Sequence, residues 1–253
     1  MTQSGTSWMS SVLAATIVAG WAVLHVTAIF IAPWPPHPLT AALVIFVQTW
    51  LSTGLFIIAH DCIHGSFAPG RPSVNRTVGR LCFAIYACLP FDRLAAAHHD
   101  HHRFAGTGAD PDFDADNPRR FAPWLLRFFR GYYSHRQIGL ITVVACAYLA
   151  TGATSLERIA LFWAVPAVLA ALQLFTFGTW LPHRHADDGF ADHHNARSNG
   201  AGWLASLVSC FHFGGYHHEH HLHPGVPWWA LPQARKRDVY PEKRSLIAAA
   251  SRP

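Results

Sequence analysis

Histidine dominates one short stretch of this 253-residue sequence. Five of the eleven residues from Gly214 to Pro224 are histidine. Three of these, His217, His220 and His221, are spaced at i, i+3 and i+4, positions that share one face of a helix. A solvated surface needs no such pattern, and a buried core would be destabilised by so many polar rings. The spacing therefore predicts three imidazoles that point at one spot, as metal ligands do.

The same spacing recurs elsewhere in the chain. His98, His101 and His102 repeat it, and His60 and His64 lie four residues apart. Imidazole binds iron, zinc, copper and nickel alike, so the ligand type does not name the metal. Nine imidazoles exceed the four ligands of a tetrahedral zinc ion and predict two metal ions with four or five ligands each. The candidate ligands are His60, His64, His98, His101, His102, His183, His217, His220 and His221.

Long apolar segments separate these histidines. The sequence is 51% hydrophobic and only 13% charged, and an apolar run of about 20 residues is long enough to cross a bilayer. A cleaved signal peptide is the alternative for the first such run, but no positively charged segment precedes it. We predict transmembrane helices at residues 12–32, 39–59, 138–154 and 159–181, with an interfacial or re-entrant segment at 78–91.

The basic residues orient these helices. Of 19 Lys and Arg residues, ten fall within residues 60–137 and eight within 183–253, and Arg158 lies in another loop. Because basic loops favour the cytoplasm, every histidine cluster is expected on the cytoplasmic side. The sequence thus predicts an all-α integral membrane protein, a single domain over residues 1–253. Four transmembrane helices would form two hairpins, with a cytoplasmic helical cap that holds a histidine-rich site for two metals.

The sequence gives weaker support for a metal-site role of the other polar residues. His183 stands alone at the end of the last predicted span, where a polar helix end explains it as well as a ligand does. The run from Asp110 to Asp116 is more typical of a solvated loop, although one or two of its carboxylates could hold histidines or arginines. Candidates for orienting imidazoles, or for solvated caps and surface positions, are Asp61, His99, Asp100, His193, His194, His218 and Glu219.

Three classes of metal protein fit the pattern poorly. A haem carrier would need single histidines inside the spans, and only His25 lies well within one. A zinc protease would need H-E-x-x-H, which the sequence from His218 to His221 does not match. A membrane metal transporter would place ionisable ligands at mid-membrane. Clusters at one membrane face instead favour a redox metal and oxygen chemistry on a hydrophobic substrate.

The clusters resemble the histidine boxes of the membrane fatty-acid desaturase and hydroxylase superfamily. Its H-x3-4-H box and its two H-x2-3-H-H boxes correspond to His60…His64, His98…His101-His102 and His217…His220-His221. A closer resemblance is to the bacterial beta-carotene 4-ketolase group, carried by Phe211–Pro224, Leu181–Arg184 and His194–Ser198. The sequence His183-Arg184-His185 departs from that group and leaves the role of His185 open.

The closer resemblance implies a carotenoid ketolase. Such an enzyme introduces a keto group at C4 of a beta-ionone ring by two oxygen-dependent hydroxylations and a dehydration. It would convert beta-carotene to echinenone and canthaxanthin, and the same chemistry would convert zeaxanthin to astaxanthin. The resemblance also implies two non-haem iron ions, dioxygen as co-substrate and an electron donor such as ferredoxin.

The remaining expectations concern location and partners. The resemblance places the protein in a bacterial inner membrane, where it would draw carotenoid from the lipid, and we expect no nucleic acid partner. It favours His183 as the ninth ligand, with His193 and His194 as alternatives. A carotenoid ring hydroxylase, a fatty-acid desaturase or hydroxylase, and a non-enzymatic membrane metal-binding protein remain open. The sequence does not distinguish between hydroxylated and unhydroxylated rings as substrates.

Overall fold

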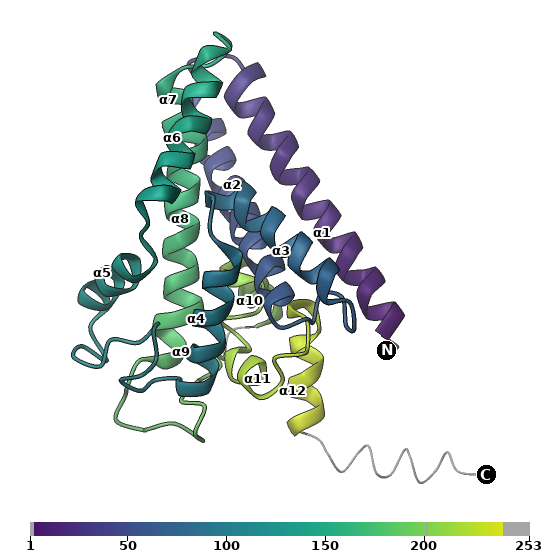
Figure 1. Ribbon diagram of the computed structural model, residues 1–253, viewed down its shortest axis with the longest axis vertical. Helices are drawn as coiled ribbons and strands as arrows, with labels where there is room; N and C mark the ends of the chain where they lie inside the picture. Colours follow the sequence, from purple (N-terminus) through teal and green to yellow (C-terminus); the bar gives the residue numbers. More distant parts are fainter. Residues whose placement is uncertain (1–2, 201, 240–253) are drawn as a thin grey trace.

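The protein is described by a computed structural model over residues 3–200 and 202–239. Within these residues every regular element is helical (Figure 1). The elements, with η1 to η3 as π-helical turns and η4 as a 3-10 turn, are α1 (Gln3–Val26), η1 (Thr27–Ile31), α2 (Pro38–Ile63), α3 (Pro72–Ala87), α4 (Phe91–Phe104), α5 (Phe121–Tyr132), α6 (His135–Ala150), α7 (Leu156–Ile159), η2 (Ala160–Ala164), α8 (Val165–Leu174), η3 (Phe175–Trp180), α9 (Leu181–His183), α10 (Trp203–Cys210), α11 (His217–Leu222), η4 (Trp228–Ala230) and α12 (Leu231–Val239).

Three helical stretches in the described residues are long and apolar enough to cross a membrane. They are Ser4–Ile31, Pro38–Ile63 and Leu156–His183. Each contains most of a predicted span but begins earlier. The fourth predicted span, residues 138–154, corresponds to α6, which is apolar but only 16 residues long. The four-span arrangement is therefore not confirmed.

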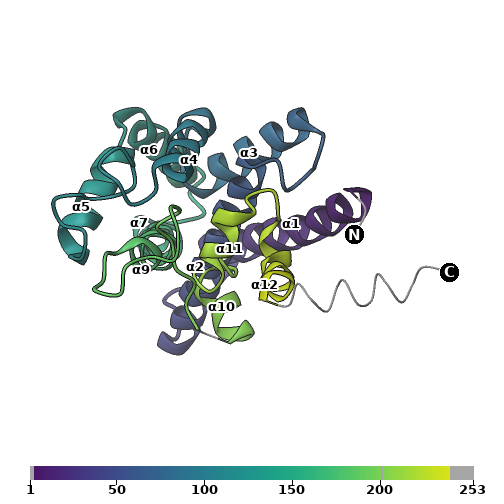
Figure 2. The ribbon, with the colours of Figure 1, turned by 90° about the horizontal axis from the view of Figure 1, so that it is seen from below.

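Helix α2 lies at the centre of the bundle and packs against α1, α3 and α8 (Figure 2). Its contact with α1 is close, and Trp21 donates a hydrogen bond from Nε1 to Ser52 Oγ at 3.0 Å. Gly54 leaves room for two neighbours, since a Cβ there would lie 2.7 Å from the Phe211 ring and 2.9 Å from Ile17. The missing side chain thus lets the C-terminal segment approach the centre of α2.

Helix α3 accounts for most of the segment 78–91 that was predicted to be interfacial or re-entrant. It runs from Pro72 to Ala87 alongside α2, and the left-handed conformation of Cys88 (φ 53°) ends it. A Cβ at Gly79 would lie 2.2 Å from the Phe91 ring, so glycine permits close packing of α3 against the start of α4. This contact sets the position of α4, which carries three candidate ligands.

The histidine-bearing segments gather at one end of the bundle. The end of α2, together with α4, α9 and α11, lies at the lower end in Figure 1, with α10 and α12 beside them. Two hydrogen bonds join the C-terminal segment to α2: the Trp228 N–H donates to Asp61 Oδ2 at 3.1 Å, and Trp50 Nε1 donates to the Leu207 carbonyl at 3.3 Å. Residues far apart in the sequence are thereby held together.

Candidate metal centre

Nine histidines from four segments form two adjoining groups. The ligand atoms within each group all lie within 4.8 Å of one another. The groups touch, since the rings of His102 and His221 are stacked with their centroids 4.2 Å apart. Group A consists of His60, His64, His98, His102 and His220, and group B consists of His101, His183, His217 and His221. The division into five and four agrees with the four or five ligands expected for each of two metal ions.

Each triple histidine cluster divides between the two groups. In α4, His98 and His102 belong to group A and His101 to group B. In α11, His217 and His221 belong to group B whereas His220 belongs to group A. The expectation that all three imidazoles of a cluster point at one spot is wrong. Successive helical residues turn by about 100°, so i and i+4 point in similar directions while i+3 and i+4 diverge.

The nitrogen spacing in both groups fits bound metal ions. In group A, His98 Nε2 lies 2.9 Å from His64 Nε2 and 3.1 Å from His102 Nε2. In group B, His217 Nε2 lies 2.8 Å from His183 Nε2 and 3.1 Å from His221 Nε2. Two nitrogens bound at right angles to one ion, each at about 2.1 Å, would be about 3 Å apart.

The electrostatics favour neutral imidazoles that present lone pairs. Burial lowers the pKa of His217, His220 and His221 well below the ordinary value, and neighbouring imidazoles lower it further. A neutral ring has only one N–H. Inward-facing Nε2 atoms without protons would repel one another at these distances, and a shared cation removes that repulsion. The residues present therefore fit metal ions in both groups.

One carboxylate holds an imidazole of group B from outside. His101 Nδ1 lies 3.0 Å from both oxygens of Asp110. Burial lowers the pKa of His101, but the charge of Asp110 and its hydrogen bond raise it more, with a contribution from Asp112. Backbone N–H groups of Gly106 and Asp112 donate to Asp110 and fix it. A carboxylate in this position orients a ligating ring and increases its basicity.

The sequence favours a solvated loop for residues 110–116, with one or two carboxylates able to hold histidines, and does not single out Asp110; the structure shows Asp110 in that second role. Asp110, Asp112 and Asp114 are all buried. The run of alternating aspartates was the available signal, because a solvated loop does not require carboxylates at every second position. A second oriented ring is His183, whose Nδ1 lies 2.8 Å from the Asn195 carbonyl oxygen. His183 thus faces group B with one nitrogen and is anchored by the other.

The weaker candidates lie outside the two groups. Asp61 accepts from the Trp228 backbone, while His99 and Asp100 are exposed on α4. Glu219 is paired with Arg235 through Nε–Oε1 and also binds Ser198, contacts that lower its pKa although burial raises it. Asp61 and Glu219 therefore make contacts that do not orient a histidine ring, and Asp100 faces solvent. His193 and His194 form a separate, more exposed cluster with Asp192, which also binds His218.

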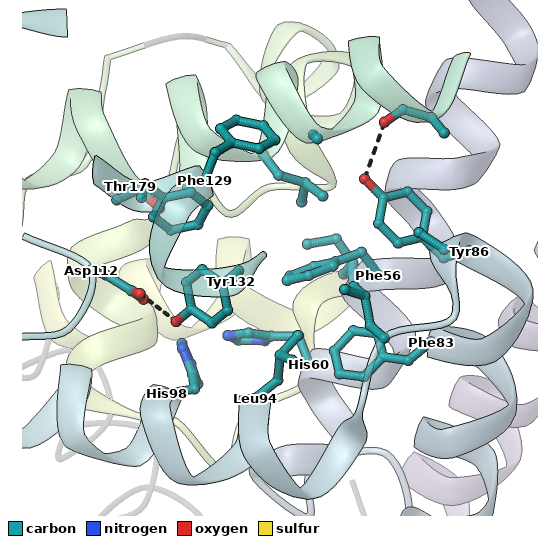
Figure 3. A pocket seen from close by; sticks show the side chains of 18 of the residues that line it. Phe56, His60, Phe83, Tyr86, Leu94, His98, Asp112, Phe129, Tyr132 and Thr179 are labelled. Atoms are coloured by element: carbon teal, nitrogen blue, oxygen red, sulfur yellow. Dashed lines mark hydrogen bonds between the residues drawn. The ribbon is translucent and has the colours of Figure 1, made fainter. Parts of the chain in front are cut away.

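An apolar cavity of about 420 Å³ lies beside both groups (Figure 3). His60 and His98 of group A and His101 and His217 of group B are among the residues that line it. Aromatic and aliphatic side chains from α2, α3, α4, α5, α6 and α8 form the rest of the wall, including Phe56, Phe83, Leu94, Phe129, Ile138 and Val168. A bound apolar molecule would therefore reach the histidines without meeting many polar groups.

These features define a class of protein: an all-helical chain with membrane-length helices and paired histidine groups compatible with metal ions, next to an apolar cavity. The sequence profile described as "Fatty acid desaturase" matches residues 32–142 and 135–249. The chain belongs to the fatty acid desaturase family.

Several individual members of this family are similar to the chain over most of its length. The chain is 51% identical over 225 residues to a "Beta-carotene ketolase" of Paracoccus sp. (strain PC1), covering 88% of this chain and 91% of that protein. It is 47% identical over 229 residues to a protein of the same name from Paracoccus sp. (strain N81106 / MBIC 01143), covering 90% and 93%. A "Zeaxanthin 4-ketolase" of Chlamydomonas reinhardtii is 34% identical over 237 residues, covering 88% of this chain and 52% of that protein.

Proposed function

We propose that this protein is a carotenoid ketolase that introduces a keto group at C4 of beta-ionone rings. The observation that carries the proposal is the identity of 51% and 47% to two beta-carotene ketolases over about nine tenths of each chain. The protein is accordingly an oxidoreductase. Beta-carotene would give echinenone after one ring is oxidised and canthaxanthin after both are, and zeaxanthin would give astaxanthin.

The histidines of groups A and B would hold two non-haem iron ions. Imidazole nitrogens suit iron, and family membership together with the two histidine groups supports the assignment. Bound iron would supply the redox chemistry that activates dioxygen. The protein's own contribution is to orient the ligands, through Asp110 at His101 and the Asn195 carbonyl at His183, and to hold the ring nearby.

The overall reaction is two successive hydroxylations at one allylic carbon. Each hydroxylation consumes one O2, two electrons and two protons, places one oxygen atom on the carbon and releases the other as water. The second hydroxylation replaces the remaining hydrogen and gives a geminal diol. Loss of water from the diol leaves the ketone. In each round O2 takes up four electrons and the C–H bond supplies only two, so the other two must come from an external donor such as ferredoxin.

The cavity supports this substrate class. Its apolar wall excludes water from the carbon that reacts and stabilises a hydrocarbon ring by burying it. Ile138 of α6 and Val168 of α8 line the cavity and are also exposed. A polyene could therefore enter sideways from the lipid, with one ring at the histidines and the remainder in the bilayer.

We place the histidine groups on the cytoplasmic side of a bacterial inner membrane. The support is the concentration of Lys and Arg within residues 60–137 and 183–253, together with three membrane-length helices. A soluble electron donor such as ferredoxin could then reach the site from the cytoplasm. Residues 240–253, which belong to the second basic region, lie outside the described residues.

The proposal is tested by expressing the protein in cells that accumulate beta-carotene and separating the pigments by chromatography with mass detection. A ketolase gives products with keto groups at C4. Accumulation of ring alcohols alone would indicate a carotenoid hydroxylase. Unchanged pigment, with folded and iron-loaded protein present, would refute carotenoid oxidation and direct the search to acyl lipids.

A further inference from the structure

A polar pair, Asp112 and Tyr132, lines the cavity close to the histidines. Asp112 lies in the loop between α4 and α5, and Tyr132 is the last residue of α5. The Tyr132 hydroxyl donates a hydrogen bond to Asp112 Oδ1. Figure 3 shows this pair at the end of the cavity that also contains His60 and His98. A carboxyl and a phenol in a largely apolar wall need a physical explanation.

The pair is not required to orient a histidine. His101 Nδ1 lies 3.0 Å from both Asp110 oxygens but 4.0 Å from Asp112 Oδ2, beyond hydrogen-bonding distance. Asp112 is instead fixed by its backbone, which donates to Asp110 Oδ1 at 2.8 Å and accepts from Trp124 Nε1 at 2.6 Å. Asp112 therefore holds the Tyr132 hydroxyl in a defined orientation at the cavity wall.

This orientation leaves Tyr132 able to accept one more hydrogen bond. A phenol has one O–H donor and also acceptor capacity on its oxygen, and here the donor is engaged by Asp112. A hydroxyl group on a bound ring could donate to that oxygen. A ring without a hydroxyl would leave only an acceptor unpaired, which is tolerated better in proteins than an unpaired buried donor. One site can thus take rings of both kinds.

We propose that the Tyr132 hydroxyl, held by Asp112, accepts a hydrogen bond from a carotenoid ring that already carries a hydroxyl group. This inference rests on the proposed function and makes Tyr132 a specificity-determining residue for it. A hydroxyl on the carbon next to C4 lies within two bonds of the carbon that is oxidised. Such a hydroxyl must occupy the histidine end of the cavity, where Tyr132 lies (Figure 3).

The test compares Tyr132→Phe with the wild type on a dihydroxylated carotenoid and on beta-carotene. One hydrogen bond in a buried site corresponds to about a fivefold to tenfold change in affinity. We expect the ratio of kcat/KM for the hydroxylated over the unhydroxylated substrate to fall by that factor, mainly through KM. Tyr133→Phe is the matched control. Tyr133 also lines the cavity, but its hydroxyl bonds to His135 Nδ1 at 2.9 Å, so this change should leave the ratio unaltered.

Equal losses on both substrates in Tyr132→Phe would overturn the inference and leave Tyr132 with a merely structural role. A second measurement uses the wild-type protein and a carotenoid whose ring hydroxyls have been converted to methyl ethers. This conversion removes the hydrogen-bond donor from the carotenoid. Binding to the purified protein is measured by the quenching of tryptophan fluorescence. The ether should bind more weakly than the alcohol. If the wild type binds alcohol and ether equally, the inference fails even where Tyr132→Phe does not fold.

The binding measurement also separates this inference from the proposed function. If the wild type oxidises neither carotenoid, the ketolase proposal fails on its own. Tyr132→Phe must still weaken binding of the hydroxylated carotenoid more than that of beta-carotene for the inference to stand. The inference fails, independently of turnover, if the variant binds both carotenoids as well as the wild type does.

Discussion

Groups A and B contain the same kind of side chain but are supported in different ways. All four histidines of group B are buried, and two of them are anchored from outside, His101 by Asp110 and His183 by the Asn195 carbonyl. Three of the five histidines in group A are partly exposed. Within the described residues no carboxylate lies within 4 Å of a group A ring nitrogen, and His60 and His220 pack against Phe213 instead.

The difference separates two ways of positioning a ligand. Hydrogen bonds from the second ring nitrogen fix both the tautomer and the orientation of an imidazole, and they do so for two of the four rings of group B, His101 and His183. Packing fixes the plane of a ring but leaves its tautomer free. This holds for His60 and His220 of group A and also for His217 and His221 of group B, whose buried Nδ1 atoms have no partner among the described residues. We therefore expect group B to hold metal more tightly and group A to exchange it more readily.

The largest effect should follow removal of one ligand from either group. His220→Ala in group A and His101→Ala in group B should each abolish formation of ketocarotenoid, because oxygen chemistry by a pair of metals needs both. Pigment analysis and iron content per chain measure the outcome. His193→Ala, outside both groups, is the control and should retain turnover. Full turnover by either group variant would exclude that residue as a ligand.

A smaller effect is expected when the support of group B is removed and its ligands stay. Asp110→Asn should lower metal affinity or activity by about tenfold to 100-fold, the usual consequence of losing a carboxylate behind a ligating histidine. Metal titration of the purified protein checks this. Asp114→Asn makes the same chemical change in the same loop, where the carboxylate binds Asp116 N and the Asn117 side chain. Equal losses in both variants would assign the effect to the loop.

Exposure to a chelator should distinguish the two groups in the wild type. Because His64, His98 and His102 are partly exposed whereas group B is buried, we expect iron to leave in two phases, with about half of it released severalfold faster. Iron released to a coloured chelator, followed with time, measures this. In Asp110→Asn the slow phase should become faster. A single phase in the wild type would contradict the proposed difference between the groups.

The smallest effect should come from a change in packing that affects groups A and B equally. Gly79→Ala would place a Cβ 2.2 Å from the Phe91 ring at the start of α4. The clash should destabilise the protein by about 1–3 kcal/mol, measured as a lower Tm. Since α4 supplies ligands to both groups, iron should be lost from both release phases in proportion. Gly108→Ala, which meets nothing within 4 Å, is the matched control.

Much of the fold could be predicted because its signals are local. Apolar runs without charge indicated three of the membrane-length helices, although the N-terminal helix begins at Gln3 and not near residue 12. The run predicted at 138–154 extends beyond the end of α6 at Ala150, because Gly152 adopts a left-handed conformation (φ 68°) in the turn that follows. A hydropathy pattern registers composition over a window and does not register where the backbone turns.

The sequence by itself determined which imidazoles are available and that eight of them lie in three short clusters, because helical spacing and residue type are properties of short segments. Only the tertiary structure decided which ring joins which group. His101 and His102 are neighbours in the chain but diverge by about 100° on α4, so they face different partners from α9 and α11. The support from Asp110 also depends on how its loop folds back over α4, which no local pattern specifies.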